Sequence, residues 1–113
     1  MSASGTAYLL IALAAAGPVP GGYDGWWVAG APAMDACPAA NLRIFVEDGL
    51  INGTVVIGQQ SLALQGEISE DGNALISAVG FFAQASFGEN GVELSFRDAC
   101  GQRRAIGDRV EAQ

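Results

Sequence analysis

The stretch that decides the fold is residues 42–57, which read LRIFVEDGLINGTVVI. Leu42, Ile44 and Val46 occupy every second position, which is typical of a strand with one buried face. Asp48-Gly49 follows, and this dipeptide favours a tight hairpin turn. The apolar alternation then resumes up to Ile57. The stretch therefore predicts two antiparallel strands joined by a short turn.

The same pattern continues through the chain from Tyr23 to Val110. Further turn signals stand at Glu70-Asp71-Gly72-Asn73 and Glu89-Asn90-Gly91, and Gly53 and Gly66 indicate bends inside strands. The chain is therefore expected to be all-β, with roughly seven to eight short strands. Closure removes exposed sheet edges, so the favoured architecture is a small antiparallel up-and-down barrel. A two-sheet β-sandwich is the alternative, because the pattern does not distinguish a closed sheet from a split one.

Composition limits the possible functions. The chain has 113 residues, of which 50% are hydrophobic and 15% charged, as expected for one folded domain. The net charge of -7, with no Lys, argues against nucleic acid as a partner. The absence of His removes Ser-His-Asp and Cys-His catalysis and His-containing metal sites. We expect no cofactor, no metal site and no catalytic residue.

The N-terminal segment bears on localisation. Residues 7–17 read AYLLIALAAAG, an uncharged run too short for the roughly 20 residues of a membrane span. It is typical of a signal peptide, with Ala14-Ala15-Ala16 as a cleavage site. Residues 1–22 are thus predicted to be a signal peptide, or alternatively a retained apolar segment, and residues 23–113 the barrel domain. Export implies a periplasmic or extracellular protein, whereas retention implies membrane association.

Two cysteines, Cys37 and Cys100, enclose most of the predicted domain. Their spacing is not that of a redox Cys-x-x-Cys motif, and two cysteines without His cannot complete a zinc site. In an oxidising compartment a single long-range disulfide is the natural interpretation. The absence of Lys beside many Ala, Gly and Arg residues favours a GC-rich bacterial gene.

The run YDGWWVAG, residues 23–30, contains adjacent tryptophans that a strand sends to opposite faces. Trp27 is expected in the core, and Trp26 is expected to be at least partly exposed as a partner contact. Arg103 and Arg104 are also adjacent, so one of them should point inward, where it needs a partner group or an anionic ligand. Both are candidate partner or ligand contacts.

Gly25-x-Trp27 on the predicted first strand resembles the Gly-x-Trp signature of calycin barrels, the lipocalin and avidin group. The run is also similar to the opening Tyr-Asp-Gly-x-Trp of short exported bacterial domains that are mostly uncharacterised. The resemblance implies that an Arg of the last strand (Arg103, Arg104 or Arg109) packs over Trp27. Gly25 has no side chain, so it would leave room for the Trp27 ring or for the guanidinium on the same face of the strand. It also implies a binding or scaffold protein rather than an enzyme.

The remaining charged residues are interpreted as surface ion pairs and turn residues rather than as a functional site. Arg43 and Arg97 should face solvent and pair with Glu47 or Glu93 across strands. Most carboxylates precede Gly or Asn at turns, where they satisfy backbone amides, and no spacing singles out the paired carboxylates of a glycosidase.

We therefore expect an exported, non-enzymatic domain of the bacterial envelope that binds a protein partner or a small ligand. One alternative is an accessory subunit of a membrane protein complex, docked through its apolar N-terminus. A small carboxylate-dependent hydrolase is the third interpretation.

Overall fold

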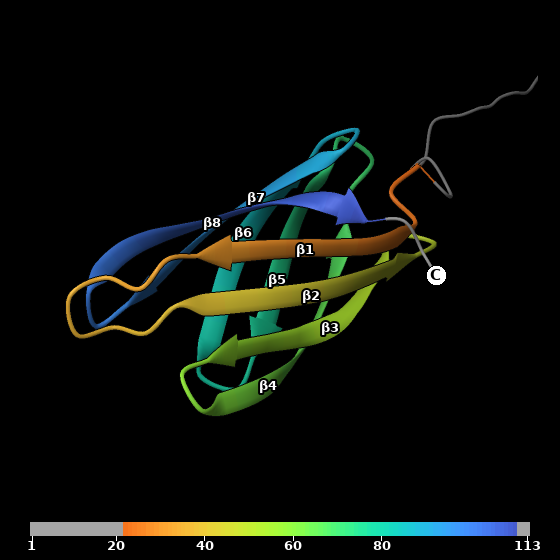
Figure 1. Ribbon diagram of the computed structural model, residues 1–113. Coiled ribbons are helices and arrows are strands. Elements are labelled where there is room, and N and C mark those ends of the chain that lie inside the picture. The colour runs from red at the N-terminus through yellow and green to blue at the C-terminus, as the bar shows by residue number, and fades with distance from the viewer. Residues whose placement is uncertain (1–21, 111–113) are drawn as a thin grey trace, which may run out of the picture.

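The strands of this protein form one closed antiparallel barrel. The computed structural model describes residues 22–110 (Figure 1). The predicted signal peptide therefore lies, apart from Gly22, outside the described residues. The eight strands follow one another in sequence order around the barrel: β1 (Gly25–Ala31), β2 (Ala40–Glu47), β3 (Leu50–Ile57), β4 (Gln60–Ile68), β5 (Asn73–Ala78), β6 (Phe81–Phe87), β7 (Gly91–Asp98) and β8 (Gly101–Val110).

Closure occurs where the first strand meets the last. β1 pairs with β8 over a register that runs from Trp26 opposite Val110 to Gly30 opposite Ile106. Every other pairing joins strands that are consecutive in the sequence. The predicted up-and-down barrel is confirmed, and the sandwich alternative is excluded because the sheet has no free edge. Within residues 22–110 there is no helix with the length and apolar character needed to cross a bilayer.

The turns form where their residues permit the required backbone geometry. Asp48 and Gly49 have φ angles of 52° and 81°, and two positive φ angles in a two-residue loop define the turn that suits the twist of a hairpin. The Asp24 carboxylate accepts the Asp48 backbone N–H at 3.0 Å, which ties this turn to the entry of β1. β5 and β6 are separate strands, divided at Val79-Gly80.

The core is built from the inward positions of all eight strands. Burial alternates along β2 and β6, as period two requires. Trp27, Ile44, Ile76 and Leu94 are fully enclosed, and they belong to one hydrophobic cluster in the interior. An eight-stranded barrel is just wide enough for side chains to fill it, and here the described side chains do so.

Three strand glycines sit where neighbouring strands approach closely. A Cβ atom at Gly53, Gly66 or Gly107 would collide with a backbone carbonyl oxygen of the adjacent strand. Gly53 and Gly66 are the positions at which the sequence predicts bends. Gly107 lies in the seam between β1 and β8, facing the carbonyl of Val28. The seam therefore closes only around a residue without a side chain.

The seam glycine gives the first testable prediction. Gly107→Ala should lower the free energy of unfolding by about 3 kcal/mol, because the added methyl meets rigid backbone. Gly91→Ala on β7 is the matched control, since a Cβ there would lie 3.6 Å from the nearest atom, in ordinary contact. Its effect should stay within about 0.5 kcal/mol. Urea melts of both variants measure the difference, and equal effects would contradict the close approach at Gly107.

Candidate functional site

Arg103 closes one end of the barrel. Its side chain is buried, and its guanidinium donates to Asp98 Oδ2 at 2.7 Å and to the carbonyl oxygens of Pro32 and Pro38 at 2.8 and 3.1 Å. The guanidinium carbon also lies 5.4 Å from the centre of the Phe96 ring. One of the adjacent arginines thus points inward as expected, and its guanidinium holds Asp98 and two backbone carbonyl groups. These contacts give Arg103 a structural role, and its role as a ligand contact stays a prediction.

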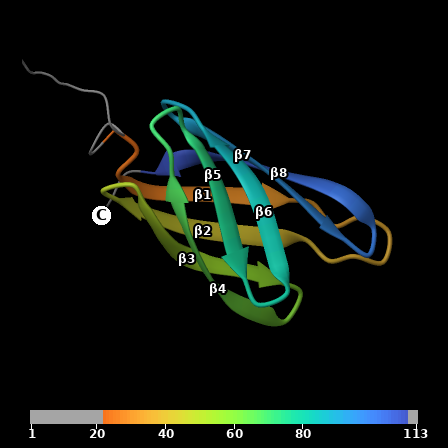
Figure 2. The same cartoon turned by 180° about the vertical axis from the view of Figure 1, so that it is seen from behind.

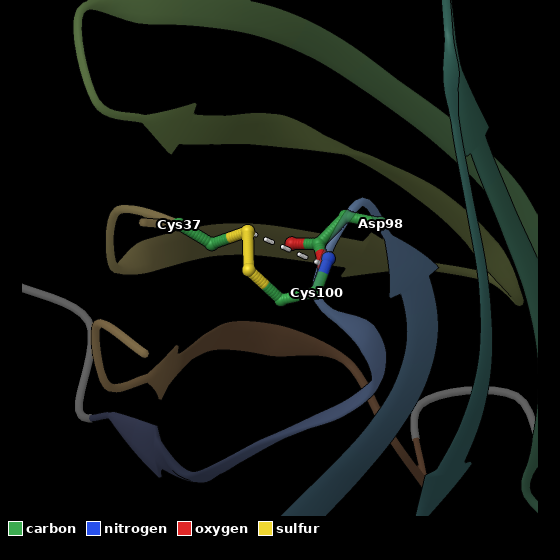
Figure 3. A group of neighbouring side chains, drawn as sticks. All are labelled: Cys37, Asp98 and Cys100. Atoms are coloured by element: carbon green, nitrogen blue, oxygen red, sulfur yellow. Dashed lines mark hydrogen bonds between the residues drawn. A yellow bond between two sulfur atoms is a disulfide. The ribbon is translucent and has the colours of Figure 1, made fainter. Parts of the chain in front are cut away.

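The disulfide stands at the same end. Cys37 in the β1–β2 loop is joined to Cys100 in the β7–β8 turn, 63 residues further along the chain, which confirms the predicted pairing (Figure 3). By loop entropy, a crosslink of this span contributes about 4 kcal/mol to stability. Arg103 bridges the same loop to the same hairpin, so the two connections hold this end together.

Asp98 links the disulfide to the buried arginine. Its Oδ1 accepts the Cys100 backbone N–H at 2.9 Å and lies 3.8 Å from Cys37 Sγ (Figure 3). Burial raises the pKa of Asp98. The hydrogen bond from the Cys100 amide and the positive charge of Arg103 together lower this pKa by more than burial raises it, so it falls below its ordinary 3.8. Asp98 is not among the site residues predicted from the sequence. The available signal was an Asp two residues before Cys100, a position from which Asp commonly accepts a turn amide.

Cys37, Asp98 and Cys100 are also the kinds of residue that bind metals, and their ligand atoms lie within 4.8 Å of one another. Metals bind cysteine as the thiolate, and both sulfurs are joined in the disulfide. Asp98 in turn is paired with Arg103. In this oxidised form the three side chains stabilise the barrel end.

The other end is closed by Trp27. Its ring is fully buried, its Nε1 donates to the Tyr23 carbonyl oxygen at 2.9 Å, and the Phe87 ring meets it edge-on at 5.0 Å. The guanidinium carbon of Arg109 lies 4.6 Å from the centre of the Trp27 ring. Arg109 also donates to the Gly22 carbonyl oxygen at 2.6 Å. Among the three arginines named by the calycin resemblance, the one over Trp27 is therefore Arg109.

Trp26 lies on the outside of the barrel and is half-buried rather than freely exposed. Its ring centre is 4.9 Å from that of Phe45 on β2, and the Arg43 guanidinium carbon is 4.9 Å from the Trp26 ring centre. Around it, exposed apolar side chains from β1, β3 and β8 share this outer wall. We call this surface the Trp26 face; its members are Trp26, Val28, Arg43, Phe45, Val56, Ile106 and Val110.

The expected pairing of the surface arginines is wrong in detail. Arg43 stacks on Trp26, since its neighbours across the register are Val28 and Thr54 rather than a carboxylate. Glu93 pairs with Arg104 at 2.6 Å instead of with Arg97. Arg104 remains largely exposed, as the outward member of its pair.

The chain was compared with known protein families, curated proteins and solved structures. No protein-family model, no curated protein and no solved structure matches the chain. The class of protein defined by the fold is a closed eight-stranded antiparallel barrel that carries one disulfide, compatible with the calycin type of barrel.

The tryptophan pair gives a prediction about register. Trp27→Ala should lower the free energy of unfolding by about 3–5 kcal/mol, because it empties a fully buried site. Trp26→Ala is the control on the adjacent residue and should cost only about 1 kcal/mol, since its ring lies on the outer wall outside the core. Denaturant melts compare the two variants. Equal losses, or the larger loss for Trp26, would show that the opposite face of β1 is buried.

Asp98 gives a prediction about pH. Because its pKa is lower in the folded protein, its ionisation stabilises the fold above the unfolded value of 3.8, and this stability is lost as the pH falls through the folded pKa. Asp98→Asn should cost about 1–3 kcal/mol at pH 7, since it leaves the buried Arg103 charge without its carboxylate. As the pH is lowered below about 5, the free energy of unfolding of this variant should also fall less steeply than that of the wild type. Identical pH profiles for wild type and variant would contradict the ion pair.

Proposed function

We propose that the protein is an exported, non-enzymatic domain of the bacterial envelope that binds a protein partner through its Trp26 face. The observation that carries this proposal is the gathering of exposed apolar side chains around Trp26 in a chain of net charge -7. Tryptophan and arginine are enriched among the residues that dominate interface energies. Here the two types are stacked on each other at the surface.

The filled interior supports a site on the outer wall. The buried side chains of all eight strands form one cluster, while Arg103 and Trp27 occupy the two ends. A ligand carrier of the barrel type holds its ligand inside, and that space is taken up by side chains here. Recognition on the outer wall needs no rearrangement of this core.

The charge of Arg43 indicates the chemistry of the partner. Both ion pairs among the described residues involve other arginines, so Arg43 has no ion pair there and stacks on the Trp26 ring. A groove beside it is lined by Val28, Asn41, Thr54 and Val56. We expect an apolar partner surface that carries a carboxylate opposite Arg43.

Two further observations support export and a binding role. A disulfide persists in oxidising compartments, which favours the periplasm or the extracellular space. The stacking of Arg109 on Trp27, two residues after Gly25, supports the calycin resemblance and with it a binding protein. Asp71 supports a structural role for a turn carboxylate, since it accepts hydrogen bonds from the Ser69 hydroxyl and the Asn73 amide.

The test is site-specific photo-crosslinking in the native cells. A photoreactive amino acid at Val28, on the Trp26 face, should crosslink to one partner protein, whereas the same amino acid at exposed Leu75 on β5 should not. The purified partner should then bind the wild-type domain, and Trp26→Ala should weaken binding about 30-fold or more, as for a central interface residue. Phe82→Ala, which removes an exposed aromatic from β6, is the matched control and should leave binding unchanged.

Three outcomes would contradict the proposal. Equal crosslinking from Val28 and Leu75 would show that the Trp26 face is not selective. Crosslinking of Val28 only to a second copy of this chain would make the face a dimer interface. Unchanged binding by Trp26→Ala would place the partner elsewhere on the barrel.

A further inference from the structure

A groove on a different part of the outer wall has a composition unlike that of the Trp26 face. It runs across β5, β6, β7 and β8 with a volume of about 650 Å³, within the range of small-ligand sites. The strands β1, β2 and β3 are in front in Figure 1, and β5 and β6 are in front in Figure 2, which shows the opposite side. We call this groove the Phe82 groove; its polar and aromatic surface comes from Ser77, Phe82, Gln84, Ser95, Arg97 and Gln102.

The strand register brings these side chains together. Ser77 lies opposite Phe82, Gln84 opposite Ser95, and Arg97 opposite Gln102. Residues opposite one another on neighbouring strands share a face of the sheet and lie within contact distance. The groove therefore presents an aromatic ring, two amides, two hydroxyls and one guanidinium on a single surface.

Phe82 lies outside the hydrophobic core cluster of the described residues. More than half of its surface (56%) is exposed, whereas its neighbours Phe81 and Ala83 point into the core. An exposed ring beside amides and hydroxyls can stack on the apolar C–H face of a ligand while the polar groups bind its hydroxyls.

Arg97 is the second unexplained feature. Arg43 and Arg109 stack on the tryptophans, while Arg103 and Arg104 pair with Asp98 and Glu93. Arg97 alone has no ion pair, side-chain hydrogen bond or ring contact among residues 22–110. No carboxylate is among the described residues that line the groove, so its local charge is positive in a protein of net charge -7.

We propose that the Phe82 groove binds an acidic saccharide, with the carboxylate of a uronic acid on Arg97 and the face of the sugar ring on Phe82. A guanidinium donates two parallel hydrogen bonds to a carboxylate, and the opposite charges strengthen them, whereas a neutral sugar has no negative charge to pair with Arg97. Gln84, Ser95 and Gln102 are placed to hydrogen-bond the ring hydroxyls. This site is separate from the Trp26 face and does not depend on the proposed protein partner.

The experiment titrates the isotope-labelled protein with trigalacturonic acid and with the corresponding neutral galactose trisaccharide, followed by amide chemical shifts. The acidic sugar should cause saturable shifts confined to β5, β6, β7 and β8, and it should bind at least about tenfold more tightly than the neutral sugar. Arg97→Gln and Phe82→Ala should each weaken binding about tenfold or more.

Two control variants separate specific binding from general effects. Arg104→Gln removes the same charge from a nearby outward arginine that is already paired with Glu93, and it should leave the affinity unchanged. Trp26→Ala alters the other face and should also have no effect. Arg97→Gln should keep the dispersed spectrum of the wild type, because the Arg97 side chain is exposed.

The proposal is overturned if neither sugar causes saturable shifts, or if the shifts centre on the Trp26 face. It is also overturned if both sugars bind equally, or if Arg104→Gln weakens binding as much as Arg97→Gln, which would reflect net charge alone. Failure of this site would leave the crosslinking result at Val28 unaffected, since the two tests concern different surfaces.

Discussion

The structure depends on the pairing of the first strand with the last. β1 and β8 meet with Gly107 against the carbonyl of Val28, a separation that leaves no space for a side chain. This contact removes the two edges that an eight-stranded meander would otherwise expose, and edges of that kind promote aggregation. It also gives every inward side chain neighbours on all sides, so the core of a small chain becomes continuous.

Closure at this seam decides where the polar chemistry lies. β8 carries both Arg103 and Arg109, an even number of residues apart, so the two side chains share the inner face near opposite ends of the barrel. One meets Asp98 and the carbonyls beside the disulfide, and the other covers Trp27. Both arginines therefore serve the fold. The two surfaces that we propose for recognition are on the outer wall, one around Trp26 and the other around Phe82.

The sequence predicted what depends on local pattern. Strand alternation, the Asp48-Gly49 turn, the buried position of Trp27 and the pairing of the two cysteines follow from period, turn chemistry and composition. It could not predict which residues face one another across strands, because a shift of register changes every such pair. The expectation that Arg43 pairs with Glu47 or Glu93 was therefore wrong, and Arg43 lies on Trp26 instead. The contacts of Asp98 and the groove at Arg97 appear only in the folded chain. The sequence likewise left three arginines as candidates for the contact with Trp27, and the pairing of β1 with β8, which places Arg109 opposite Trp27, identifies the one.

Native-state hydrogen exchange at the seam tests the closed barrel most directly. If β1 and β8 are paired as described, the amides of residues 26–30 and 106–110 that form the ladder should exchange only through global unfolding, with the same free energy as the core amides of residues 42–46. Low-energy exchange at the seam, while the β2–β3 hairpin stays protected, would show an open sheet with two free edges. That result would contradict the closed core and the assignment of recognition to the outer wall.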